Sequence, residues 1–164
     1  MPRVRGFTLV ELLVVIAVLA IALAAVSLAG GGSARQAQAQ ISQLAVLLPL
    51  LGEATGRQQR WHALRIDATG YQVMQLRGQP ARWQAVPGQE PVALPPSWYW
   101  QLDTAAALAA GVVAADGGPA PQLVLASGGQ TTPFRLALRQ REGGQGGWVL
   151  HSDGFNAPVL EALP

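Results

Sequence analysis

The feature that most constrains this chain is one carboxylate at the entrance of a long apolar segment. Arg3 and Arg5 precede the motif Gly6-Phe7-Thr8-Leu9-Val10-Glu11, and the 23 residues from Leu12 to Ala34 then carry no charge. An acidic side chain within a membrane segment costs roughly 2.5–3.5 kcal/mol at mid-helix on insertion scales. A carboxylate kept at this position therefore needs a partner, and the identity of that partner bears on function.

The apolar segment is long enough to cross a membrane as a helix. At about 1.5 Å per residue it extends roughly 35 Å, against a hydrocarbon core of about 30 Å. Arg3 and Arg5 stand before it, and the positive-inside rule places such a flank in the cytoplasm. We therefore expect a single-pass protein whose chain beyond Gly30 lies outside the inner membrane.

A secretory signal peptide is the alternative interpretation of this segment. Signal peptides have an apolar core of about 7–15 residues followed by a small-residue cleavage site, and such sites occur at Ser27-Leu28-Ala29 and Ala37-Gln38-Ala39. The chain would then be a periplasmic binding protein or enzyme. The apolar run is longer than this class requires, however, and the interpretation gives Glu11 no role beyond favouring the start of a helix.

The run Gly6-Phe7-Thr8-Leu9-Val10-Glu11-Leu12-Leu13-Val14-Val15-Ile16 resembles the class III leader of type IV pilins and type II secretion pseudopilins. The resemblance implies that a prepilin peptidase removes residues 1–6 by cutting between Gly6 and Phe7, and that Phe7 is N-methylated. It also implies that residues 7–32 remain as a transmembrane and filament-core helix. Glu11 would then pair with the N-terminal ammonium of a neighbouring subunit and set register during assembly on an inner-membrane platform.

Residues 33–164 are expected to form one periplasmic, pilin-like domain that begins with an amphipathic helix over about 33–55. The triplet Gly30-Gly31-Gly32 predicts a meltable point or a break before this helix, since each Gly costs about 1 kcal/mol relative to Ala. Pro49 predicts a kink. Apolar residues at helical spacing predict the buried seam: Ile41, Leu44, Leu48 and Leu51, with Leu47 and Leu50 widening it.

From Trp61 the apolar period changes to two, which predicts β-strands over about 61–164. Asp67-Ala68-Thr69-Gly70 predicts a hairpin turn, and the phase shift between Val73 and Met74 predicts a bulge or burial on both faces. Further strands are expected at 64–67, 71–77, 82–86, 98–102, 122–126, 134–139 and 148–151, and 105–115 is ambiguous between helix and loop. The predicted fold class is α+β, a long N-terminal helix packed on an antiparallel, sandwich-like domain.

Several segments after the helix are similar to the H-type minor pseudopilins of type II secretion, the GspH family. They are Gly56 to Asp67, Gly70-Tyr71-Gln72-Val73, Arg82-Trp83-Gln84 and Pro133-Phe134-Arg135-Leu136. The resemblance implies a subunit near the pseudopilus tip that links the I/J/K-type tip complex to the major G-type subunit during export across the outer membrane. A minor pilin of a type IV pilus, serving adhesion, twitching or DNA uptake, is the alternative.

Nothing in the composition favours an enzyme or a nucleic-acid-binding protein. The chain has no Cys, and its 11 basic residues fall to nine once Arg3 and Arg5 are removed, which balances nine acidic residues. His62 and His151 are the only histidines, and Ser127, His151 and Asp153 lack a nucleophile-elbow pattern. Calcium takes six to eight oxygen ligands, more than Asp153, Asn156 and Glu161 offer. We predict no cofactor and no metal.

The run Trp98-Tyr99-Trp100 is the candidate contact site on the globular domain. Alternate residues of a strand face opposite sides of the sheet, so these three aromatic rings cannot all point inward. We therefore expect either Tyr99 or the two Trp to contact another pseudopilin.

Overall fold

The computed structural model describes the backbone of residues 9–104, 114–126, 130–142 and 146–164, and the side chains from residue 32 onward except Gln58. The chain divides into two compact units, Met1–Arg35 and Gln36–Pro164, which are described separately. The helix or loop expected over 105–115 falls mostly outside the described residues.

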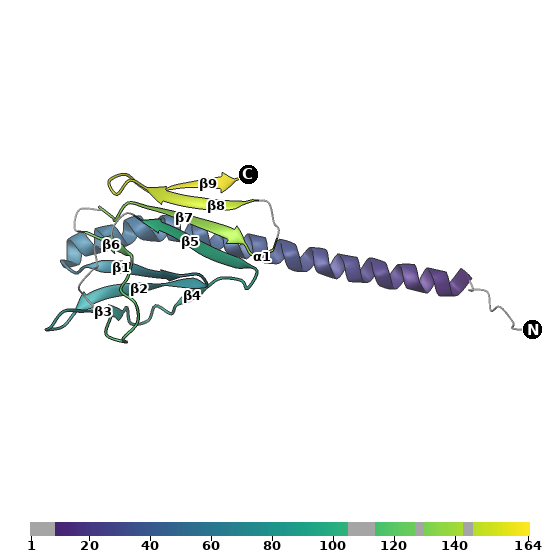
Figure 1. Ribbon diagram of the computed structural model, residues 1–164, viewed down its shortest axis with the longest axis horizontal. Helices are drawn as coiled ribbons and strands as arrows, with labels where there is room; N and C mark the ends of the chain where they lie inside the picture. Colours follow the sequence, from purple (N-terminus) through teal and green to yellow (C-terminus); the bar gives the residue numbers. More distant parts are fainter. Residues whose placement is uncertain (1–8, 105–113, 127–129, 143–145) are drawn as a thin grey trace, which may run out of the picture. The chain divides into compact units, whose positions relative to one another are not determined.

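One α-helix, α1 (Leu9–Gln58), runs through both units without interruption (Figure 1). A break at Gly30-Gly31-Gly32, one of the two predicted alternatives, is therefore wrong, because helical dihedrals are open to Gly and its low propensity is only a weak preference that flanking helix formers override. The meltable point stays a prediction. The helix also continues past Pro49 to its end. Among the residues whose side chains the structure describes, from residue 32 onward, no helical stretch combines the length and apolar character needed to cross a membrane.

The buried face of α1 in the second unit confirms the predicted seam. Ala37, Ile41, Leu44, Leu48 and Leu51 are each at most 7% exposed. The predicted widening of the seam is wrong, since Leu47 is only half-buried and Leu50 is 53% exposed. At about 100° per residue, Leu50 lies on nearly the opposite side of the helix from Leu48.

The first sheet contains strands β1 (His62–Asp67), β2 (Gly70–Arg77), β3 (Arg82–Ala85) and β6 (Leu123–Leu125) in the order β3-β2-β1-β6, and β4 (Val92–Ala93) also pairs with β2. The β1–β2 hairpin confirms the predicted turn: Asp67 Oδ1 accepts hydrogen bonds from the backbone N–H groups of Thr69 at 2.7 Å and Gly70 at 2.9 Å. Pairing of β1 with β6 brings Leu64 opposite Leu123, far away in sequence.

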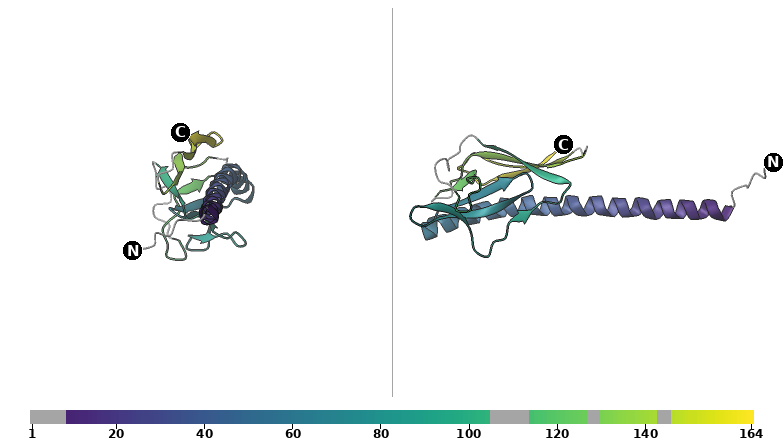
Figure 2. Two further views of the ribbon diagram at one scale, coloured as in Figure 1. Left: turned by 90° about the vertical axis from the view of Figure 1, so that its right-hand side faces the viewer. Right: turned by 60° about the horizontal axis from the view of Figure 1, so that its bottom comes forward.

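The second sheet contains β5 (Trp98–Thr104), β7 (Phe134–Gln140), β8 (Gly147–Ser152) and β9 (Val159–Leu163) in the order β5-β7-β8-β9. All its pairings are antiparallel. A hydrogen bond from Trp100 N to Ala68 O, 3.1 Å long, joins the two sheets. Both sheets lie alongside the C-terminal part of α1 (Figure 2). The described residues thus confirm the predicted antiparallel, β-rich domain with one helix.

The first sheet is buried on both faces, which explains the phase shift in β2. One face carries His62 and Leu64, which are buried. The other contributes residues to a separate cluster: Ala63, Met74, Trp83 and Val124 pack with Ala114. The β1–β2 register runs without an inserted residue, so burial on both faces, rather than a bulge, accounts for the pattern.

Candidate interaction surfaces

The N-terminal motif lies largely outside the part of the chain that the structure describes. Gly6 and Phe7 precede the first described residue, and Glu11 is placed by its backbone in the first turns of α1 without a description of its side chain. Cleavage after Gly6, methylation of Phe7 and the register role of Glu11 therefore remain predictions.

The aromatic run on β5 divides between the two faces of its sheet, as the strand period requires. Trp98 and Trp100 are each 4% exposed, and the Trp98 ring packs on Trp148 with centroids 5.3 Å apart. Burial within the protomer removes both Trp from the predicted interface. Tyr99 is half-buried on the other face, with the Arg141 guanidinium 5.6 Å from its ring centroid. Its contact with another subunit remains a prediction.

His62 joins α1 to the first sheet rather than acting as a surface residue. The Thr55 hydroxyl donates to Leu51 O at 2.9 Å and lies 2.9 Å from His62 Nδ1, while Gln75 Nε2 lies 3.2 Å from His62 Nε2. Because the single Thr55 hydrogen is used on the helix carbonyl, Nδ1 carries the proton and Nε2 accepts from the Gln75 amide. Burial, the largest influence, lowers the pKa of His62, which favours this neutral form.

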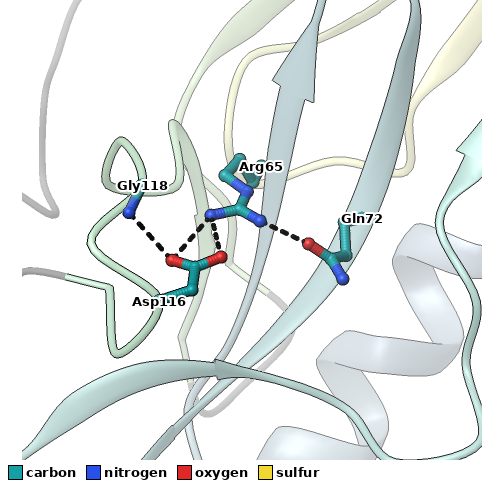
Figure 3. Close-up of polar contacts among 4 residues, drawn as sticks. All are labelled: Arg65, Gln72, Asp116 and Gly118. Atoms are coloured by element: carbon teal, nitrogen blue, oxygen red, sulfur yellow. Dashed lines mark hydrogen bonds and ion pairs between the residues drawn. The ribbon is translucent and has the colours of Figure 1, made fainter.

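Arg65 ties the loop around Asp116 to strand β1 of the first sheet (Figure 3). Its guanidinium lies 2.8 Å from Asp116 Oδ2 and donates to Gln72 Oε1 at 2.6 Å. Asp116 Oδ1 also accepts the Gly118 N–H at 3.0 Å. The Gly118 hydrogen bond, followed by that of Arg65, lowers the pKa of Asp116. We interpret this cluster as structural, because its donors and acceptors satisfy one another.

A tight turn after β8 holds one aromatic side chain in solvent. Phe155 is 76% exposed, the largest exposure among the large hydrophobic side chains of the described residues. Asp153 Oδ1 accepts the backbone N–H groups of Phe155 at 2.9 Å and Asn156 at 2.8 Å. These bonds, that of Asn156 first, lower the pKa of Asp153 to about 2. The turn is therefore fixed while its Phe side chain has little cover.

A second apolar feature lies on the outward face of α1. Val46 is 63% exposed and Leu50 53% exposed. With Leu47 and Tyr71 they line a shallow groove of about 560 Å³. The helical spacing of these apolar residues predicted a wider seam rather than a separate exposed face. The sequence did not indicate the exposure of Phe155 either.

The described residues weighed above as catalytic groups or calcium ligands do not converge on a site. Among the described residues no three His, Asp or Glu side chains are grouped to hold a metal ion. His151 Nε2 instead lies 3.6 Å from Glu161 Oε1 across β8 and β9, while the Asp153 carboxylate is engaged by its own turn. Ser127 lies outside the described residues.

Comparison with known proteins places these features in a family. Residues 1–27 match the family model for the prokaryotic N-terminal methylation motif. The chain is 32% identical to type II secretion system protein H of Pseudomonas aeruginosa, over 96% of this chain and 95% of that protein. The chain belongs to the type II secretion system protein H family. It is also 28% identical to protein H of Aeromonas hydrophila, over 85% of this chain and 83% of the relative.

Two solved structures show the same fold as this H-family chain. Both are of the minor pseudopilin EpsH from the type II secretion system of Vibrio cholerae, with a TM-score of 0.58 in each case. They are 21% and 23% identical to this chain and cover 78% and 79% of it, and 96% and 94% of their own chains. These structures confirm the fold. The identity to the Pseudomonas aeruginosa protein confirms the predicted family and, with it, the predicted class, a structural subunit of the secretion system rather than an enzyme.

Proposed function

We propose that this H-family chain is a minor structural subunit of the type II secretion pseudopilus, linking the tip complex of I/J/K-type subunits to the major G-type subunit. The observation that carries the proposal is the 32% identity to a type II secretion system protein H, which covers 96% of this chain and 95% of that protein. Both curated relatives carry the name of the secretion system, which favours it over a type IV pilus.

The N-terminal residues suit a subunit that waits in the inner membrane before assembly. In this proposal a prepilin peptidase cuts after Gly6, Phe7 becomes the methylated N-terminus, and the apolar segment anchors the chain with its domain in the periplasm. The new ammonium then lies four residues from Glu11. Two opposite charges attract strongly in a medium of low dielectric, whereas either one alone is costly there. Glu11 therefore favours the register in which a neighbour's N-terminus meets it.

Two measurements test this function in the bacterium that encodes the chain. The intact mass of the mature protein should correspond to a chain that begins at N-methylated Phe7. Deletion of the gene should abolish release of type II substrates into the medium while twitching motility persists. A mature chain that begins near Gly30 or Gln40 would contradict the proposal, and so would loss of twitching with normal secretion.

Glu11→Ala separates assembly from processing. We expect normal leader cleavage but at least about tenfold less cross-linking to the major subunit, because an uncompensated buried ammonium costs several kcal/mol. Glu90→Ala is the matched control, since Glu90 is an exposed carboxylate in a loop of the domain. Equal incorporation of the two variants would refute the register role.

A further inference from the structure

The exposed Phe155 borders a hollow that the protomer does not fill. The hollow has a volume of about 220 Å³ and will be called the Phe155 hollow. Its lining combines the end of α1 with the segment after β8: Leu48, Pro49, Glu53, Thr131, Phe155, Asn156, Ala157 and Pro158. A phenyl ring beside an apolar floor is the arrangement in which interface anchors are found.

The turn that presents Phe155 is fixed before any partner arrives. Besides the Asp153 bonds, Ser152 Oγ accepts the Gly154 N–H at 3.0 Å and donates to Asn156 O at 3.2 Å. Gly154 has φ +92, and a Cβ there would lie 2.6 Å from Thr131 O, so only Gly fits. Because the backbone is already ordered, binding at Phe155 loses little conformational entropy.

The only charged group that lines the hollow, among the described residues, is the carboxylate of Glu53. A second carboxylate, that of Asp153, lies outside the lining and two residues before Phe155, and the hydrogen bonds of its turn, that of the Asn156 N–H first, lower its pKa to about 2. The ion pair of Glu53 with Arg57 is 3.4 Å long and exposed on both sides, so it is weak. The Thr131 hydroxyl oxygen is buried, and no other described residue hydrogen-bonds to it. A positively charged side chain complements this set.

We infer that the Phe155 hollow receives a lysine or arginine side chain of the adjoining pseudopilin, whose aliphatic stem packs on the Phe155 ring while its cationic end faces Glu53. Such side chains commonly bury their stems against apolar surface and keep the charged end at the rim, and a cation near an aromatic face is attracted to it. The inference rests on the proposed function, since it takes the partner to be a neighbouring subunit.

Photo-cross-linking in cells tests the inference on the full chain. A benzoylphenylalanine placed at position 155, in a strain with the complete secretion system, should cross-link to another pseudopilin identified by mass spectrometry. The same probe at Gln101, an exposed position on β5 at the other edge of the second sheet, is the positional control. Products with a secreted substrate, with lipid or with no protein at position 155 would overturn the inference.

Charge reversal tests the chemistry of the partner. In the strain that carries the probe at position 155, Glu53→Lys should lower the yield of the pseudopilin product about tenfold, and Glu53→Gln should lower it less. An unchanged yield in Glu53→Lys would overturn the assignment of a basic side chain. If position 155 gives no product while Gln101 cross-links to pseudopilins and secretion still requires the chain, the inference fails and the proposed function stands. Secretion that does not require the chain rejects both.

Discussion

Replacement of Thr55 by Val tests whether a hydrogen bond, rather than packing alone, fastens the end of α1 to the first sheet. Thr55 is 1% exposed, and its hydroxyl oxygen lies 2.9 Å from both Leu51 O and His62 Nδ1. Val keeps the shape of the side chain and removes the hydroxyl. The His62 Nδ1–H then loses its acceptor in a site where the His side chain is only 5% exposed.

The magnitude follows from the group that is left unpaired. A buried donor without a partner costs about 1–3 kcal/mol. The bond to Leu51 O contributes little beyond this, because a helix carbonyl at that position already accepts the backbone N–H four residues later. We therefore expect the free energy of unfolding to fall by about 1–3 kcal/mol, which corresponds to roughly 2–4 °C in melting temperature per kcal/mol.

The assay is thermal and denaturant unfolding of the full chain in detergent. Thr55→Ser retains the hydroxyl and should recover most of the loss. Thr104→Val is the matched control, because its exposed hydroxyl donates to Pro133 O at 3.0 Å and its removal should cost under about 0.5 kcal/mol. If Thr55→Val is as stable as the natural chain and Thr55→Ser is weaker, packing of the methyl group holds the helix end and the reasoning is wrong.

Three further predictions concern the stability of the chain. Burial lowers the pKa of His62 in the folded chain. Below about pH 6.5 the unfolded chain therefore binds a proton that the folded chain does not. The melting temperature should fall as the pH falls, and it should fall less steeply in the His62→Gln variant. Arg65→Met should lower the free energy of unfolding, measured with denaturant, by about 1–2 kcal/mol, because the Arg65 side chain is 18% exposed. Arg57→Met is the control: its side chain is 75% exposed, and the change should stay under about 0.5 kcal/mol. Gly70→Ala places a Cβ against the backbone carbonyl of Val92 in β4 and should cost more than about 1 kcal/mol. Gly32→Ala meets nothing within 4 Å and should raise helix stability, measured by circular dichroism, by roughly 0.5–1 kcal/mol.

The elements with strong local signals could be predicted from the sequence. The seam of α1 follows from an apolar residue every three or four positions, and the β1–β2 hairpin follows from Asp67 and Gly70 at its turn. The long N-terminal motif carried most of the functional prediction, because its residues must occur in one order.

Other features depended on contacts that one sequence does not reveal. β9 escaped prediction because the edge strand is largely exposed and carries little alternation of apolar and polar residues. Periodicity identified Leu50 as apolar but could not show that no element of the protomer covers it. The turn that exposes Phe155 combines local hydrogen bonds to Ser152 and Asp153 with a 2.9 Å bond from Thr131 N to Gly154 O, and this last contact joins segments far apart in the sequence.

The pairing of β1 with β6 has a consequence for how the chain emerges during synthesis. Strands β1, β2 and β3 are neighbours in sequence and can pair before the rest of the domain is present, but β6 reaches β1 only after residue 125 has been made. The second sheet forms later still, because β5 is an edge strand of that sheet and its neighbour among the described strands is β7. Until then the Ile41–Leu44–Leu48 side of the helix has only part of its cover, so the nascent chain is most prone to aggregate shortly before it is complete.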